Sequence, residues 1–248
     1  MVEIGSVFGW EKGLKRQMGE RRQTGSRFGE IWEELQTVFS GRVQWVDSLL
    51  PPLIFVILNT IFGFEVALWG SLGIALLFVG FRLLRRQPLR YAIGGLGGVV
   101  LAVIVARFVG GAEGYFLPGI VTGVFTSFLC LASVIVRRPL VAWTSYFTRR
   151  WPLNWYWHPK VRPAYSEVTL AWALFFALRT LLQFELFQDQ AASALGLLQL
   201  ISGWPAIIVL LVATYLYGVW RLENLGGPSV DEFKAGSEPP WQGQKRGF

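Results

Sequence analysis

Long apolar runs separated by short polar connections make up most of the chain between residues 48 and 222. A helix of about 20 apolar residues crosses the hydrocarbon core of a bilayer, which is about 30 Å thick. The pattern therefore predicts an all-α polytopic membrane bundle of six helices, whose expected ranges are 49–64, 66–84, 91–108, 115–136, 168–187 and 204–220. The last apolar tract, 191–222, is too long for one span, and we expect it to break at Gly203, Trp204 and Pro205.

Polar segments flank this expected membrane domain of residues 48–222. Residues 1–25 lack the apolar core of a cleavable signal peptide, which predicts a polar tail. Over residues 26–47, apolar side chains recur every three or four positions. That spacing predicts an amphipathic helix that lies in the membrane interface or docks on the protein's own loops. Residues 223–248 are rich in Gly, Pro and charge, and we expect a disordered cytoplasmic tail.

Basic residues gather in two of the predicted connections. The first holds Arg82, Arg85, Arg86 and Arg90, and the second holds Arg137, Arg138, Arg149, Arg150, Lys160 and Arg162 against the single acid Glu167. By the positive-inside rule both connections, and with them both termini, are expected on the cytoplasmic side of a bacterial inner membrane. The formal net charge of +7 then has a topological origin, so no nucleic-acid partner is expected.

Composition supports the membrane assignment and yields no enzyme signature. Hydrophobic residues make up 53% of the chain and charged residues 16%, against about 25% charged in soluble domains. No phosphate-binding loop, HExxH or GxSxG motif occurs, and His158, the only histidine, has no metal-binding neighbours at ligand spacing. We therefore expect neither catalysis nor a metal or cofactor.

Two further patterns have structural interpretations. The residues Trp151, Trp155, Tyr156 and Trp157 are typical of an interfacial aromatic anchor, and the alternative is a groove for a lipid headgroup or an amphiphile. Glycines spaced by four, at Gly94 and Gly98 and again at Gly119 and Gly123, predict close helix packing. A short match between LPPLI at Leu50 and LPGIV at Leu117 suggests an inverted repeat, whereas RRQPL at Arg85 and RRPL at Arg137 suggest a parallel one.

Arg179 is the strongest candidate for function, because it lies inside the apolar run WALFFALRTLLQFELF. It follows Val168 by 11 residues, or about 17 Å of helix, near the middle of the expected span. A central Arg on a lone helix costs at least about 2.5–3.5 kcal/mol, so its side chain should face the bundle interior or a wet cavity. Gln183 lies one turn later on the same face. Candidate partners are the carboxylates of Glu65 and Glu113 and the uncharged side chains of Asn59, Thr122, Thr126 and Gln199.

The strings GGAEGYFLPG (110–119), VRRPLV (136–141) and AYSEVTLAWALFFALRTLLQ (164–183) resemble an uncharacterised six-span bacterial membrane family, common in actinobacteria and known as a domain of unknown function. The resemblance covers roughly residues 48–222 and implies a distant likeness to the intracellular septation protein A family, which is associated with envelope maintenance and division. Its most characteristic matches are Glu113, Phe116, Pro118, Arg137, Arg138, Pro139, Arg179 and Gln183.

Several functions fit these features. The sequence favours a non-catalytic envelope or assembly protein in which Arg179 holds the bundle together. A small transporter or channel for an anionic solute, with Arg179 as the binding charge, is the main alternative. An enzyme acting on a lipid and an accessory subunit of a larger membrane complex are less favoured. The expected partners are the lipid bilayer and, for assembly, further copies of the chain or other membrane proteins.

Overall fold

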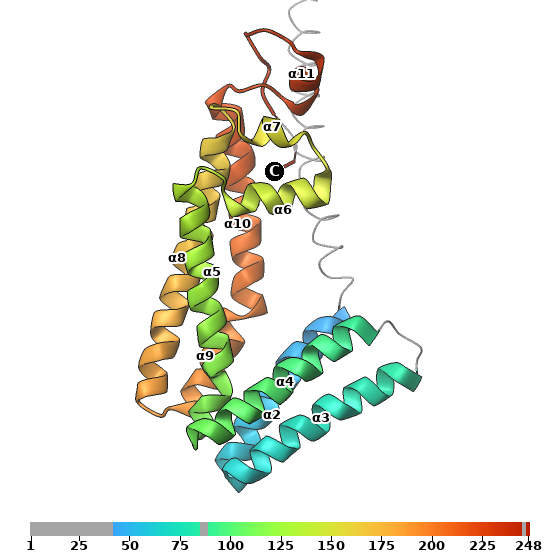
Figure 1. The fold of residues 1–248 in the computed structure, drawn as a ribbon, viewed down its shortest axis with the longest axis vertical. Helices are drawn as coiled ribbons and strands as arrows, with labels where there is room; N and C mark the ends of the chain where they lie inside the picture. Colours follow the sequence, from blue (N-terminus) through green and yellow to red (C-terminus); the bar gives the residue numbers. More distant parts are fainter. Residues whose placement is uncertain (1–41, 85–88, 245–246) are drawn as a thin grey trace, which may run out of the picture. The chain divides into compact units, whose positions relative to one another are not determined.

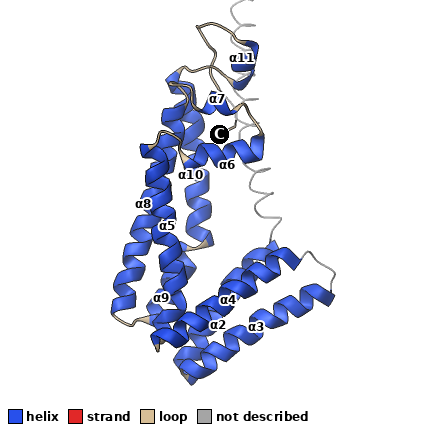
Figure 2. Cartoon of the chain, in the orientation of Figure 1, coloured by secondary structure: helices blue, strands red, loops and turns tan. Residues whose placement is uncertain are grey.

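The structure is a computed structural model that describes residues 42–84, 89–244 and 247–248 of the 248-residue chain. Helices joined by short loops make up these residues, and none of them forms a strand (Figure 2). The predicted all-α fold is thereby confirmed. The predicted amphipathic helix over 26–47 lies outside the described residues as far as residue 41, and residues 42–47 belong to the first described helix. Residues 43–248 form one compact unit.

Three helices of equal length open this unit: α2 (Arg42–Phe62), α3 (Phe64–Leu84) and α4 (Leu89–Val109) (Figure 1). The turn between α2 and α3 is a single residue, Gly63, whose φ of +84° favours glycine. Small buried side chains on α3 and α4 let these two helices pack closely, and larger ones complete the core that they share with later elements. This core contains Phe55, Ala67, Leu68, Ala102, Ala106, Tyr115, Phe116, Ala192 and Leu195.

The next helices form the part of the unit that carries Arg179. A short 3-10 helix, η1 (Ala112–Phe116), leads into α5 (Leu117–Ile135), whose second residue is Pro118. Proline suits this position because the first helical N–H groups have no partner within the helix. The long helix α8 (Arg162–Gln188) packs along α5 (Figure 1).

The break predicted in the last apolar tract is confirmed. Helix α9 (Ala192–Ser202) ends at Gly203, whose ψ of −131° is not helical, and α10 (Trp204–Leu225) begins at the next residue with Pro205 in its first turn. Proline and the non-helical glycine together redirect the chain, so α9 packs on α8 and η1 while α10 continues along α8.

Four stretches are long and apolar enough to cross a membrane among the residues described: Phe64–Phe81, Ala112–Ile135, Arg162–Gln188 and Ala192–Leu225. Helices α2 and α4 hold shorter apolar stretches, Leu50–Phe62 and Gly94–Val109. Large apolar side chains such as Phe125, Phe128 and Leu181 are about 60% exposed on these helices, as lipid-facing residues are. The chain is therefore a membrane protein, and the full count of six spans stays a prediction.

The C-terminal tail differs from the expected disordered segment. Residues 230–235 form helix α11 (Val230–Ala235), which Ser229 and Glu232 cap reciprocally. The ring of Phe248 stacks on Tyr165 at 4.3 Å between centroids, and the indole N–H of Trp155 donates to the carbonyl oxygen of Pro228 over 2.9 Å. The polar composition suggested disorder, but a few apolar residues of the tail complete a buried cluster.

Candidate ligand cavity

A cavity of about 470 Å³ lies among α2, α4, α5, α8 and α9. Its wall is mostly glycine, proline and apolar side chains: Pro51, Pro52, Gly94, Gly95, Gly98, Val99, Leu101, Ala102, Phe116, Pro118, Gly119, Gly123 and Phe176. The polar lining residues are Tyr115, Thr122, Thr126, Arg179, Gln183 and Gln199. A mostly apolar pocket of this size with a few convergent polar groups is typical of a small-molecule site.

Arg179 and Gln183 supply the hydrogen-bond donors of this cavity. They lie one turn apart on α8, and both line the wall, as the sequence predicted for a shared face. The Nε of Arg179 and the Nε2 of Gln183 are buried, and neither has a hydrogen-bond partner among the described residues. Gln183 is only 1% exposed. Buried donors without acceptors are costly, and the described residues leave these two donors unsatisfied.

The carboxylates expected to pair with Arg179 lie elsewhere. Glu65 accepts two hydrogen bonds from Arg107, Nη1 to Oε1 at 2.7 Å and Nη2 to Oε2 at 2.8 Å. Glu113 folds back over Gly111 in η1. Neither Glu113 nor Asn59 is among the lining residues, and those described include no carboxylate. The pairing considered for Arg179 is therefore not found in the part of the chain that the structure describes.

The uncharged side chains considered as partners of Arg179, apart from Asn59, do line the cavity. Thr122, Thr126 and Gln199 all line the cavity with Arg179. The two threonine hydroxyls donate within α5, Thr122 to the carbonyl of Pro118 over 2.7 Å and Thr126 to that of Thr122 over 2.8 Å. Their protons are thus used inside the helix, so each hydroxyl can offer a neighbour in the cavity only its oxygen, as an acceptor.

The glycines predicted to pack helices divide into two groups. A Cβ added at Gly123 would overlap Oγ1 of Thr180, so α5 and α8 approach each other closely at this glycine. At Gly94, Gly98 and Gly119 an added Cβ would meet no atom within 4 Å. These three line the cavity, and their missing side chains make room there instead of bringing helices together.

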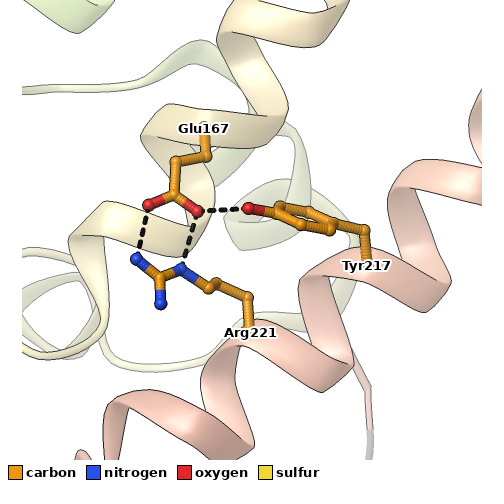
Figure 3. A network of polar contacts seen from close by, with 3 residues as sticks. All are labelled: Glu167, Tyr217 and Arg221. Atoms are coloured by element: carbon orange, nitrogen blue, oxygen red, sulfur yellow. Dashed lines mark hydrogen bonds and ion pairs between the residues drawn. The ribbon is translucent and has the colours of Figure 1, made fainter.

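A second polar network, which the sequence analysis did not identify, links α8 to α10 at the end of α8 that begins with Arg162 (Figure 3). Arg221 donates from Nε and Nη2 to the two carboxylate oxygens of Glu167, each over 2.8 Å, and the hydroxyl of Tyr217 donates to Oε2 over 2.7 Å. Tyr217 and Arg221 are four residues apart and share one face of α10. Glu167 lies 12 residues before Arg179, or about 18 Å along the helix, so this network is separate from the cavity.

Among the predicted aromatic anchors, Trp155 and Tyr156 belong to helix α7 (Leu153–Tyr156), which follows α6 (Leu140–Arg149), and Trp151 and Trp157 flank α7. Trp155 and Tyr156 are 0% exposed, so these two belong to a core of the protein and not to a surface that lipid headgroups contact. Burial raises the pKa of Tyr156, whose hydroxyl bonds with that of Ser145 over 3.1 Å. Trp151 and Trp157 are half-buried, and Arg138 lies 4.3 Å above the ring of Trp157.

His158 lies beside this cluster. Burial and the nearby charge of Lys160 lower its pKa, and its ring contacts Phe233 and Trp241. Throughout the described ranges, no three His, Cys, Asp or Glu side chains gather as a metal site would require.

Long apolar helices, and a cavity whose described wall holds one cation, define a membrane protein built from several helices. The chain belongs to the family described as Protein of unknown function (DUF3159), whose model matches residues 39–221. The predicted resemblance to a domain of unknown function is thereby confirmed, while the actinobacterial distribution and the likeness to septation protein A stay predictions. No curated protein and no solved structure matches the chain.

Proposed function

We propose that this protein is a small membrane transporter for an anionic solute, with Arg179 as the binding charge. One observation carries the proposal: Arg179 lines a 470 Å³ cavity whose described residues include no carboxylate. Its Nε donor is buried without a partner in the described structure. A bound anion would satisfy both the charge and the donor.

The depth of Arg179 supports this assignment. It lies nine residues before the last residue of α8, Gln188, which corresponds to about 14 Å of helix. A guanidinium at that depth in a membrane costs several kcal/mol unless it meets an anion, a polar partner or water. Intramembrane charges of this kind are typical of solute pathways.

The hypothesis of a purely structural role has less support. An arginine that holds helices together by a salt bridge requires a carboxylate on another helix, and neither Glu65 nor Glu113 lines the cavity. Glu65 forms a bidentate pair with Arg107. We therefore favour the hypothesis of a transporter that binds an anionic solute over that of an assembly protein, whereas the sequence favoured the assembly protein.

The lining also favours binding without chemical conversion. The described wall includes no Asp, Glu, His, Cys or Lys, so Tyr115 is the one side chain in it, apart from Arg179, that could give up a proton. The two matched segments LPPLI and LPGIV both reach the cavity, through Pro51, Pro52 and Pro118. Transporters built from inverted repeats place their site between such segments, in agreement with the proposal. The proposal keeps the predicted placement in a bacterial inner membrane with cytoplasmic termini.

Binding and transport can be tested with the full chain in lipid nanodiscs and vesicles. Calorimetric titrations would use chloride, nitrate, phosphate, acetate, hexanoate and octanoate, and any anion that binds would then be tested for counterflow. We expect Arg179→Gln to abolish binding, and Arg179→Lys to weaken it because a lysine lacks the planar fork of arginine.

Arg107→Gln is the matched control, since it removes an exposed arginine outside the cavity. It should leave the affinity unchanged. If no anion of the panel binds, or if Arg179→Gln binds as well as the parent chain, the proposal is refuted.

A further inference from the structure

We infer that the ligand of this cavity is an amphiphilic monoanion, with a carboxylate head on Arg179 and an apolar body along the glycine-lined face of α4. The inference rests on the proposed function and specifies its substrate class. Three properties of the cavity lead to it: its charge balance, the chemistry of its wall and its open side.

The charge balance sets the head group. Arg179 is the single cation in the described wall, and no acid accompanies it. One negative charge on the ligand gives a neutral site, whereas a dianion leaves a net charge in a low-dielectric interior. The guanidinium fork matches the two oxygens of a carboxylate, and the unpartnered amide of Gln183 adds a donor from the same face.

The remaining wall sets the body of the ligand. A compact ion fills little of 470 Å³, since one water molecule takes about 30 Å³ of liquid. Much of the wall is apolar: Gly94, Gly95 and Gly98 of α4, Val99, and Phe176 of α8 all bound the cavity. Added Cβ atoms at the three glycines would meet nothing within 4 Å, so no other atom of the described chain fills the space beside them. An apolar group of the ligand fits it better than water does.

The open side of the cavity sets the route of entry. Gly94, Gly98 and Gly119 are exposed although they line the wall. Leu101, also in the wall, is 52% exposed, and Val121 on α5 is 59% exposed. An apolar rim at membrane depth opens toward lipid rather than toward water. A ligand with an apolar body can partition into the bilayer and enter from that side.

The experiment measures the affinity of linear carboxylates from acetate to octanoate for the full chain in nanodiscs, with empty nanodiscs as the blank. Burial of each methylene contributes about fourfold in Kd, so affinity should rise steadily with chain length until the cavity is full. Octanol, which lacks the charge, should bind weakly and respond little to Arg179→Gln. Octyl phosphate should bind more weakly at pH 8, as a dianion, than octanoate does.

A matched pair of variants locates the apolar body. Gly98→Val places a side chain in the cavity, whereas Gly97→Val places one at the neighbouring position, which is equally open but outside the wall. Gly98→Val should weaken octanoate binding by roughly tenfold or more and leave acetate unchanged, because only the longer ligand reaches that wall. Gly97→Val should change neither. If Gly98→Val fails to fold, Gly94→Val provides the same test, since that position is also open.

The outcomes separate this inference from the proposed function. Arg179-dependent binding of acetate or phosphate with no gain along the carboxylate series would overturn the amphiphile and leave anion binding intact. Equal octanoate affinities in Gly98→Val and Gly97→Val would also overturn it. Failure of every anion to bind refutes both.

Discussion

The contact between Gly123 on α5 and Thr180 on α8 allows the sharpest test of how the bundle is held together. A Cβ at position 123 would overlap Oγ1 of Thr180, and Cβ of that threonine would lie 3.5 Å away. Thr180 is 7% exposed, so its side chain has little space to move into. Gly123→Ala should therefore force the two helices apart or drive Thr180 off its rotamer.

Two opposing contributions determine how much Gly123→Ala changes the free energy of unfolding. Overpacking of a buried contact costs about 1–3 kcal/mol. Replacing a helical glycine by alanine returns about 1 kcal/mol of helix propensity in water. The net effect of Gly123→Ala is thus a loss of about 0–2 kcal/mol. Thr180→Ala removes the overlapping atom, and because Oγ1 has no hydrogen-bond partner in the described structure, its loss leaves no acceptor unsatisfied.

A double-mutant cycle isolates the overlap from helix propensity. We expect Gly123→Ala and Thr180→Ala to couple by about 1–3 kcal/mol, with the double variant more stable than Gly123→Ala alone. The matched cycle of Gly119→Ala with Thr180→Ala should be additive, since a Cβ at Gly119 would meet nothing within 4 Å.

Thermal unfolding in detergent, followed by the fluorescence of the 12 tryptophans, measures each corner of both cycles. Each kcal/mol should shift Tm by about 2–4 °C in a unit of this size. A coupling energy below about 0.5 kcal/mol between Gly123→Ala and Thr180→Ala would refute the close approach of α5 and α8 at this point. So would a coupling energy between Gly119→Ala and Thr180→Ala that is as large as that between Gly123→Ala and Thr180→Ala.

The other predictions concern the end of α8 that carries the tail. Glu167→Gln should lower Tm by less than Gly123→Ala does, because the half-exposed pair with Arg221 contributes little, whereas an equal or larger drop would make the pair a main support. Trp155→Phe should cost about 1–3 kcal/mol by leaving the carbonyl of Pro228 without its donor, and limited proteolysis should cleave the tail faster; an unchanged cleavage rate contradicts this. Backbone N–H groups of Gln242 and Ser229 lower the pKa of Glu232. Because the pKa of Glu232 is lower in the folded than in the unfolded chain, its contribution to stability is complete above the unfolded pKa and is lost as pH falls through the folded pKa. Cleavage of the tail by an acid-active protease should therefore become faster below pH about 4 in the parent chain. In Glu232→Gln, which has no carboxylate to protonate, cleavage should not become faster over the same pH range.

Features that depend on neighbours along the chain could be read from the sequence. The helices follow from long apolar runs, and the break between α9 and α10 follows from Gly203 and Pro205, whose backbone constraints act locally. The shared face of Arg179 and Gln183 follows from helical periodicity alone. For the same reason the sequence determined that a permanent charge lies within the membrane domain and needs a partner.

Features that depend on contacts between helices were decided by the tertiary structure. Glu65 was an open candidate for Arg179 until the packing of α3 on α4 placed it beside Arg107. Gly98 and Gly123 have the same sequence signature and both line the cavity, yet only Gly123 also lies at a close helix contact. Trp155 is of the residue type found in interfacial anchors, but it is buried, and its indole N–H donates to the carbonyl oxygen of Pro228 in the tail. In each case the residue's role depends on the rotation and separation of two helices, which no local pattern specifies. The sequence therefore determined that Arg179 lies within an apolar helix, whereas only the packing of the helices determined that a cavity lies beside it.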